Sequence, residues 1–263
     1  CAAPPILPPT SPVTKPEIII CRGADELHRK AAEQFVALAH QAIAARGRFA
    51  VALSGGSTPK ALYSLLATAE FSEQLTWRQI HLFFGDERCV PPDHGESNFR
   101  MVKESLLSKI IIPAENVHRM AGEIAPKVAA AGYAAQLTCF FQLKENSPPR
   151  FDLILLGLGE DGHTASLFPG NSASNENERL VAPTYVEKLK AHRLTLTLPA
   201  INNAAQITFL IAGQSKAAVV KAILTGENID APAARIKPGN GKLSWLITQD
   251  AAGDLGDIQN TLE

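Results

Sequence analysis

Short apolar runs alternate along the chain with longer stretches in which apolar residues recur every three or four positions. Short runs bounded by polar or glycine-containing segments are typical of strands. We predict strands at Glu17–Cys21, Phe49–Leu53, Ile80–Phe84, Phe151–Leu156, Ile207–Ala212 and Leu243–Thr248. Phe49–Leu53 is apolar throughout, which indicates a strand buried on both faces of a sheet.

The stretches between these runs predict helices. A long amphipathic helix is expected from a cap at Asp25 to Gly47. Further helices are expected from Lys60 to about Ala69, at Ala125–Leu143, and from Ser215 to about Leu224. Arg193–Leu198 alternates polar and apolar residues, which fits a half-exposed strand. Strands that alternate with helices indicate crossover connections, and therefore an α/β fold with a mostly parallel sheet.

Residues 1–16 are rich in proline and show neither helical nor strand periodicity. This composition predicts a flexible N-terminal arm or the remnant of a targeting segment. No linker divides the remainder, so residues 17–263 are predicted to form a single α/β domain.

Composition narrows the classes of partner. The formal net charge of −1 argues against a broad surface for nucleic acid or for an anionic membrane. No apolar run approaches the ~18 residues of a membrane span. The four cysteines are widely spaced and form no CxxC pair, which is typical of a reducing compartment and offers no zinc site. We expect a cytoplasmic protein, or an organellar one if the arm belongs to a targeting segment.

A glycine-containing loop follows the strand Phe49–Leu53 and predicts an anion site. Its glycines let backbone N–H groups approach a ligand, and Thr58 is expected to cap the next helix with Pro59 at the first helical position. The N-terminus of that helix attracts phosphate. The predicted contacts are Ser54, Gly55, Gly56, Ser57 and Thr58. The alternative is a glycine turn and a capped helix without a ligand.

Charged residues follow or begin other predicted strands. In the tetrapeptide Gly85–Arg88, Arg88 is a candidate clamp for an oxyanion or phosphate, and Asp86 is a candidate acceptor for a sugar hydroxyl. Arg193 and Lys216 are candidate second cations. The alternative for each is a solvated surface charge.

The segment GLGEDGHTASLFPG, residues 157–170, follows the strand Phe151–Leu156. Its glycines satisfy GxGxxG, but Pro169-Gly170 interrupts the helix that a dinucleotide site requires, which argues against that site. The glycines instead suit a turn that presents His163 as a general base, with Asp161 or Glu160 to orient its ring. The alternative is a histidine that caps a short helix.

Ligands of such sheets bind beyond the carboxyl ends of the strands. The loops that follow the strands at residues 49–53, 80–84, 151–156 and 207–212 are therefore expected to converge on one face. HExxH and GxSxG are both absent, which excludes the common zinc-hydrolase and nucleophile-elbow signatures.

The motifs in order resemble the 6-phosphogluconolactonases of the glucosamine-6-phosphate isomerase/6-phosphogluconolactonase family. They are SGGSTP, then GDER with Ser97-Asn98 ten residues later, then GLGEDGHTASLFPG. The resemblance covers about residues 17–250, and TASLFPG is its most specific part. Deaminases and isomerases of this superfamily characteristically carry DEY where this chain has Asp86-Glu87-Arg88. The proline-rich arm is an addition to the family's pattern, and Thr248 stands where an acid is frequent.

The resemblance implies a modified Rossmann-like, mostly parallel sheet flanked by helices, with a small accessory β-sheet. It implies hydrolysis of 6-phospho-D-glucono-1,5-lactone without a cofactor or metal, the second step of the oxidative pentose phosphate pathway. His163 is then the general base, with Asp161 and Arg88 as further catalytic residues. The glycine loop borders the ligand, and Arg88 and Arg193 are cationic contacts, with Lys216 a weaker assignment.

Two other functions remain open. One is a sugar-phosphate deaminase or isomerase that acts on glucosamine 6-phosphate, and the other is a non-catalytic sugar-phosphate sensor. In each case the expected partner is a small sugar phosphate rather than nucleic acid or membrane. The oligomeric state is open, with a monomer or a weak dimer both compatible with the sequence.

Overall fold

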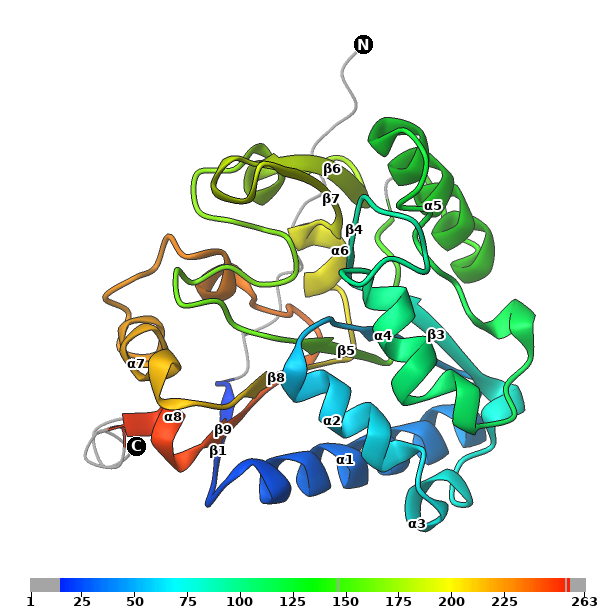
Figure 1. Cartoon of the computed structure of the whole chain (residues 1–263), viewed down its shortest axis with the longest axis horizontal. Coiled ribbons are helices and arrows are strands. Elements are labelled where there is room, and N and C mark those ends of the chain that lie inside the picture. Colours follow the sequence, from blue (N-terminus) through cyan, green and yellow to red (C-terminus); the bar gives the residue numbers. More distant parts are fainter. Residues whose placement is uncertain (1–14, 146, 254, 256–263) are drawn as a thin grey trace.

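The computed structural model describes residues 15–145, 147–253 and 255 of the chain. Its centre is a six-stranded parallel sheet (Figure 1). In sheet order, its strands are β1 (Glu17–Cys21), β9 (Lys242–Thr248), β8 (Gln206–Ile211), β5 (Leu153–Leu156), β2 (Phe49–Leu53) and β3 (Ile80–Phe84). The six strands predicted for this sheet are confirmed, with ends that shift by one or two residues at most.

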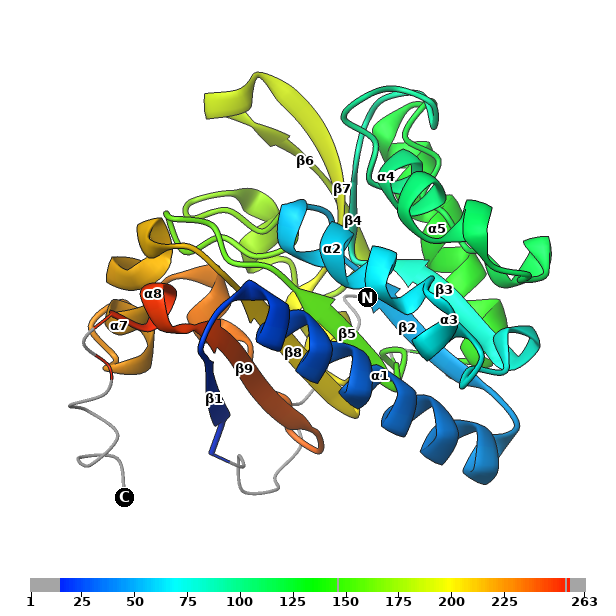
Figure 2. The ribbon, with the colours of Figure 1, turned by 60° about the horizontal axis from the view of Figure 1, so that its bottom comes forward.

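The apolar runs form these strands because both faces of the sheet are covered. Every residue of β2, β5 and β8 is buried, as expected for central parallel strands. The helices are α1 (Ala24–Arg46), α2 (Ser57–Leu66), α3 (Ala69–Ser72), α4 (Asn98–Ser105), α5 (Pro126–Phe141), α6 (Leu198–Asn202), α7 (Ala217–Leu224) and α8 (Gln249–Ala252). Figure 2 shows α1 crossing one face of the sheet with α2 beside it. The four helices predicted from periodicity correspond to α1, α2, α5 and α7.

Two predicted helix caps are wrong. Helix α1 begins after Gly23, and Asp25 lies in its first turn without a capping hydrogen bond. Helix α2 begins at Ser57, so Thr58 and Pro59 are inside its first turn rather than at the cap and first position. The chain enters α2 early because Gly56 takes a positive φ of 107° that glycine alone tolerates readily. Proline remains acceptable there because the first-turn N–H groups have no partner within the helix.

A second, three-stranded sheet contains β4 (Asp86–Arg88), β7 (Ala191–Leu196) and β6 (Val181–Val186) in the order β4-β7-β6. Both pairings are antiparallel. The small sheet projects away from the large one (Figure 2). The accessory sheet implied by the resemblance is therefore present.

The strand predicted at Arg193–Leu198 is shifted and is not half-exposed. It runs from Ala191 to Leu196, and the side chains from Arg193 to Leu196 are buried. The prediction failed because β7 is the central strand of the small sheet and also contacts α5. Leu198 instead begins α6, where Pro199 suits the first turn.

Most of the predicted arm, residues 1–16, lies outside the described residues, and the single domain at 17–263 stays a prediction. Within the described part of the chain, no helix combines the length and the apolar character needed to cross a membrane.

Candidate active site

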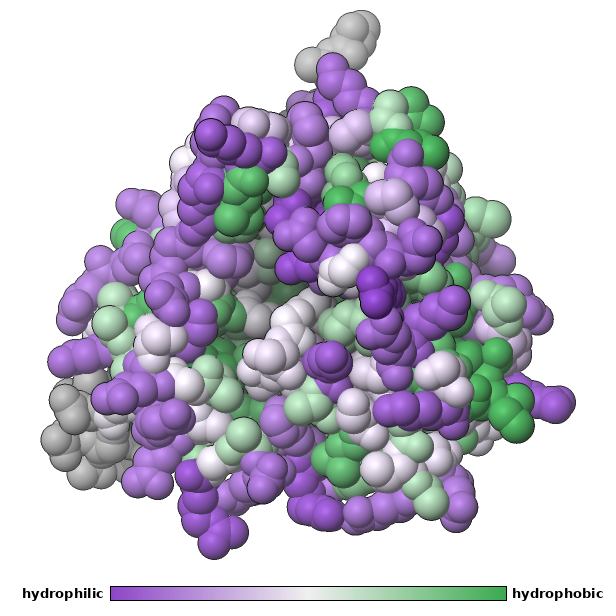
Figure 3. Space-filling model, in the orientation of Figure 1, coloured by the Kyte–Doolittle hydropathy of each residue, from purple (hydrophilic) through white to green (hydrophobic). Residues whose placement is uncertain are grey.

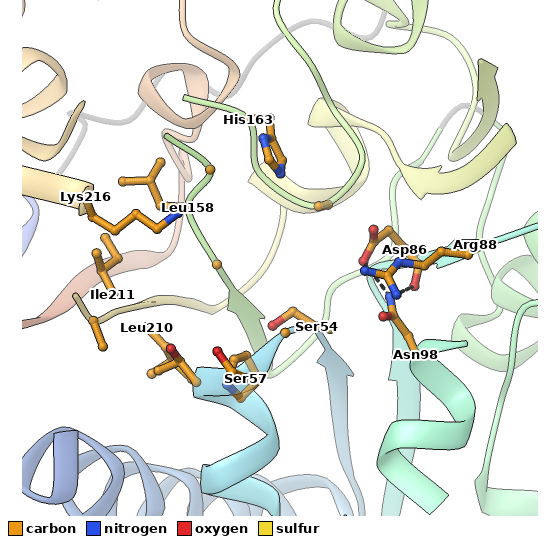
Figure 4. A pocket seen from close by; sticks show the side chains of 18 residues that line it. Ser54, Ser57, Asp86, Arg88, Asn98, Leu158, His163, Leu210, Ile211 and Lys216 are labelled. Atoms are coloured by element: carbon orange, nitrogen blue, oxygen red, sulfur yellow. Dashed lines mark hydrogen bonds between the residues drawn. The ribbon is translucent and has the colours of Figure 1, made fainter. Parts of the chain in front are cut away.

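A cavity of ≈ 300 Å³ lies at the carboxyl ends of β2, β3, β5 and β8. Its walls come from the four loops that were predicted to converge, and this prediction is confirmed. The lining residues used below are Ser54, Gly55, Gly56, Ser57, Thr58, Asp86, Arg88, Asn98, Gly159, His163, Ala165 and Lys216. Figure 4 shows several of these side chains around the cavity, and Figure 3 shows that this face of the molecule is mainly hydrophilic.

Tyr63 of α2 fixes the glycine loop, residues 54–58, through hydrogen bonds to its first residue. The Tyr63 hydroxyl accepts a hydrogen bond from Ser54 N at 3.0 Å and donates to Ser54 O at 2.9 Å. Gly55 must lack a side chain, because a Cβ there would lie 2.0 Å from Asn98 Oδ1. The Ser54 hydroxyl is buried and has no hydrogen-bond partner among the described residues. This loop therefore brings free donors and the N-terminus of α2 to the cavity.

Strand β4 separates the acids of the GDER segment. Asp86 and Arg88 line the cavity, whereas Glu87 accepts hydrogen bonds from the backbone N–H groups of Asn98 and Phe99. Successive side chains of a strand point to opposite faces, which explains the split. Burial raises the pKa of Glu87, although these N–H groups oppose the shift. Glu87 thus anchors the start of α4 and is not part of the site.

The ring of His163 is fixed by two neighbours. Its Nδ1 pairs with the Asp161 carboxylate, and its face stacks on Phe168 with the ring centres 4.2 Å apart. Gly159 makes room for the ring, because a Cβ there would lie 1.9 Å from His163 Nδ1. Of the two acids considered as orienting groups, Asp161 contacts the histidine, while Glu160 lies 3.8 Å from Lys216 Nζ.

Lys188 also contacts the His163–Asp161 pair, and it was not predicted from the sequence. It follows β6, and its Nζ pairs with the second oxygen of Asp161. Burial alone raises the pKa of Asp161, but the hydrogen bonds from Lys188 and His163 outweigh it and hold that pKa well below its usual range. Asp161 is therefore an anion that links the histidine to a lysine. No local motif signals this contact.

The two candidate second cations differ in position. Lys216 lines the cavity, across from Arg88 in Figure 4. Arg193 does not line it. Its backbone lies opposite that of Arg88 in the antiparallel pairing of β4 and β7. Burial and the nearby charge of Arg88 lower the pKa of Arg193. A ligand contact of Arg193 stays a prediction.

In the described part of the chain, no three His, Cys, Asp or Glu side chains are grouped so that they could hold a metal ion. The expectation of a reaction without cofactor or metal stays a prediction.

Residues 22–245 match the family described as glucosamine-6-phosphate isomerases/6-phosphogluconolactonase. The chain belongs to this family. A relative from Synechocystis, named 6-phosphogluconolactonase, is 45% identical over 218 residues, which are 82% of this chain and 88% of the relative. A solved 6-phosphogluconolactonase from Trypanosoma cruzi is 30% identical, with a TM-score of 0.80 over 94% of this chain and 99% of that one.

The family's fold is also found in a monomeric glucosamine-6-phosphate deaminase. That structure is 20% identical, with a TM-score of 0.76 over 90% of this chain and 98% of that one. At this identity the likeness concerns the fold alone. The predicted family and its Rossmann-like sheet with an accessory sheet are confirmed, while the roles of the individual site residues stay predictions.

Proposed function

We propose that this chain hydrolyses 6-phospho-D-glucono-1,5-lactone to 6-phosphogluconate in the oxidative pentose phosphate pathway. The proposal depends on one observation. His163 lines the cavity, and its Nδ1 pairs with the carboxylate of Asp161. The 6-phosphogluconolactonase relative in Synechocystis supports the substrate and the reaction.

The geometry supports His163 as a general base. Because the Asp161 carboxylate accepts the hydrogen bond from Nδ1–H, the lone pair of the ring is on Nε2, and the residue lines the cavity. Nε2 takes a proton from water as the water oxygen attacks the lactone carbonyl carbon. The ring C–O bond then breaks, and the departing oxygen takes up a proton as a hydroxyl. The carboxylate of Asp161 stabilises the imidazolium that forms in between.

Arg88 is placed to stabilise negative charge on the carbonyl oxygen. Its guanidinium lines the cavity and is held by the carbonyl of Glu96, which fixes its position before substrate arrives. A fixed cation in a partly enclosed site stabilises a developing oxyanion without reorganisation. Asp86 is beside it as an acceptor for a substrate hydroxyl.

The opposite side of the cavity suits the phosphate. Ser57 lies in the first turn of α2, and Lys216 lines the same cavity on the side away from Arg88 in Figure 4. Unpaired N–H groups at a helix N-terminus and an ammonium group together form an anion site. With the phosphate placed there, we propose that the lactone ring lies between His163 and Arg88, which line the same cavity.

The test is turnover of freshly prepared 6-phosphogluconolactone, corrected for its spontaneous opening. We expect acceleration by the wild-type chain and no ammonia from glucosamine 6-phosphate. Ammonia release would instead identify a deaminase, and binding of 6-phosphogluconate without turnover of the lactone would identify a sensor. Either of these results contradicts the proposal.

A further inference from the structure

The segment Thr164–Phe168 contains a tight turn that has no role in the hydrolytic steps proposed above. Thr164 and Leu167 exchange two backbone hydrogen bonds, of 3.3 and 2.9 Å, with Ala165 and Ser166 at the tip. Ala165 has a φ of +49°, a left-handed conformation that residues other than glycine rarely adopt. Such a conformation persists only where surrounding contacts impose it.

Those contacts belong to Ser166. Its hydroxyl donates a 2.6 Å hydrogen bond to Asp86 Oδ2, and its backbone N–H donates to Thr195 Oγ1 at 3.3 Å. Ser166 is only 2% exposed, and Asp86 is 80 positions away in the chain. The strained turn therefore holds one hydroxyl group against one carboxylate in the cavity wall.

Asn98 holds the other oxygen of the same carboxylate. Its Nδ2 donates to Asp86 Oδ1 at 3.2 Å and to the backbone oxygen of Asp86 at 3.0 Å. Asn98 is itself buried, and its side chain touches the backbone at Gly55. Each carboxylate oxygen of Asp86 thus has a fixed donor from a separate segment of the chain.

Asp86 keeps acceptor capacity for a ligand. An ionised carboxylate offers about four acceptor positions, and two are occupied by Ser166 and Asn98. Among the described residues, no lysine, arginine or histidine lies at ion-pair distance from Asp86. The remaining lone pairs are on a residue that lines the cavity. The matching ligand group is a hydrogen-bond donor, because a carboxylate accepts hydrogen bonds, and the donors that a sugar lactone ring offers are its hydroxyls.

We propose that Ser166 and Asn98 are positioning residues that fix the Asp86 carboxylate as the acceptor for one ring hydroxyl of the substrate. The pair thereby determines selectivity for a hydroxylated lactone ring. This inference rests on the proposed lactonase function. A carboxylate fixed by two donors cannot turn to another partner, so a substrate that lacks the hydroxyl leaves a buried acceptor unpaired.

The experiment compares kcat/KM of the wild type and of Ser166→Ala on four substrates. These are 6-phosphogluconolactone and its 2-, 3- and 4-deoxy analogues. We expect the wild type to disfavour one deoxy analogue by roughly 10- to 100-fold, the worth of a hydrogen bond to a charged group. Ser166→Ala should lose about 10-fold on the parent lactone, mainly through KM, and under about 2-fold on that one analogue.

Two further variants complete the test. Ser105→Ala is the matched control, since Ser105 is 3% exposed, donates to a backbone carbonyl at 2.7 Å and lies outside the cavity. It should leave all four rates unchanged. Asp86→Asn should remove the discrimination as Ser166→Ala does, because an amide cannot keep two donors and a hydroxyl in the same places.

The possible results distinguish failure of the positioning role from failure of the proposed lactonase function. Equal losses on all four lactones in Ser166→Ala would indicate a structural role and overturn the inference, as would a wild type that does not discriminate among the analogues. Failure of the wild type to accelerate opening of the parent lactone would instead overturn the proposed function.

Discussion

His163 and His118 are held in the same way and are placed to do different things. His163 stacks on Phe168 with ring centres 4.2 Å apart, and His118 stacks on Phe83 at 4.1 Å. Stacking fixes the plane of each ring to a similar degree. The two residues therefore share a stacked phenylalanine, although His118 also contacts the rings of His81 and Phe140.

The polar partners of the two rings are different. His118 is 8% exposed, and its ring nitrogens lie 3.3 Å from His81 and 3.2 Å from Gln136. No carboxylate is among these partners. Burial and the neighbouring His81 lower the pKa of His118 to about 4, so its ring is neutral at neutral pH.

His163 has an anion on Nδ1 and the cavity at its side. The carboxylate stabilises the imidazolium form that a base must pass through, whereas the surroundings of His118 oppose that form. A fixed ring alone is therefore not a catalytic base. The carboxylate and access to the substrate are what distinguish the two histidines.

The largest predicted effect is the loss of the base. His163→Gln should lower kcat on the lactone by roughly 10²- to 10⁴-fold, the usual contribution of general-base catalysis. The matched variant His118→Gln should change kcat by less than about 3-fold, because that side chain is remote from the cavity. Steady-state rates on fresh lactone measure both. Near-normal turnover in His163→Gln would show that another group takes the proton.

The next effect concerns the orienting carboxylate. Asp161→Asn replaces an acceptor by an amide that can donate to Nδ1 and so favours the wrong tautomer of His163. We expect kcat to fall by roughly 10²- to 10³-fold while KM changes little, since the wrong tautomer carries a proton on Nε2 and cannot act as the base. The same steady-state assay measures it. A variant with unchanged kcat would mean that the Asp161 contact does not orient the base.

The smallest predicted effect is a change in the free energy of unfolding with pH, and it arises from the titration of His118. Its folded-state pKa of about 4 is below the unfolded value near 6.5, so the unfolded chain binds a proton more readily between these values. Stability is therefore highest above pH 6.5 and falls as the pH drops toward 4, by about 2 kcal/mol from this group at pH 5. Urea unfolding of the wild type and of His118→Gln at pH 7 and pH 5 measures it.

The glutamine variant should lose less stability on acidification, because glutamine does not titrate in this range. Gln136→Glu extends the comparison by giving His118 a carboxylate partner of its own. It should raise the pKa of His118 and reduce the acid sensitivity, with no gain in lactone turnover. Identical pH dependence in wild type and His118→Gln would contradict this account of the buried histidine.

The large sheet was predictable because buried parallel strands are short continuous apolar runs. The small sheet was not predictable from the pattern alone. Strand β4 is the polar tripeptide Asp86–Arg88, and β6 (Val181–Val186) contains Pro183 within it. Both are strands only because β7 pairs with each of them. Pairing between distant segments is not a local property of the sequence.

In the candidate site too, features set by local sequence could be predicted, and contacts between distant segments could not. The glycine loop, Arg88, Lys216 and the His163 turn could be predicted because each follows its own strand, and parallel strands end at one edge. The contacts of Lys188 with Asp161 and of Ser166 with Asp86 cross 27 and 80 positions of the chain, and no spacing rule predicts them. Glu87 had no predicted role, and strand alternation turns it toward α4.

The central claim is that His163 accepts the proton of the attacking water. The most direct test is the pH dependence of kcat/KM for the lactone, corrected for spontaneous opening, in the wild type, His118→Gln and His163→Gln. We predict that the rate falls on acidification in the first two, because a protonated imidazole cannot act as a base. The residual activity of His163→Gln should lack this fall. The same acid limb in His163→Gln would contradict the account.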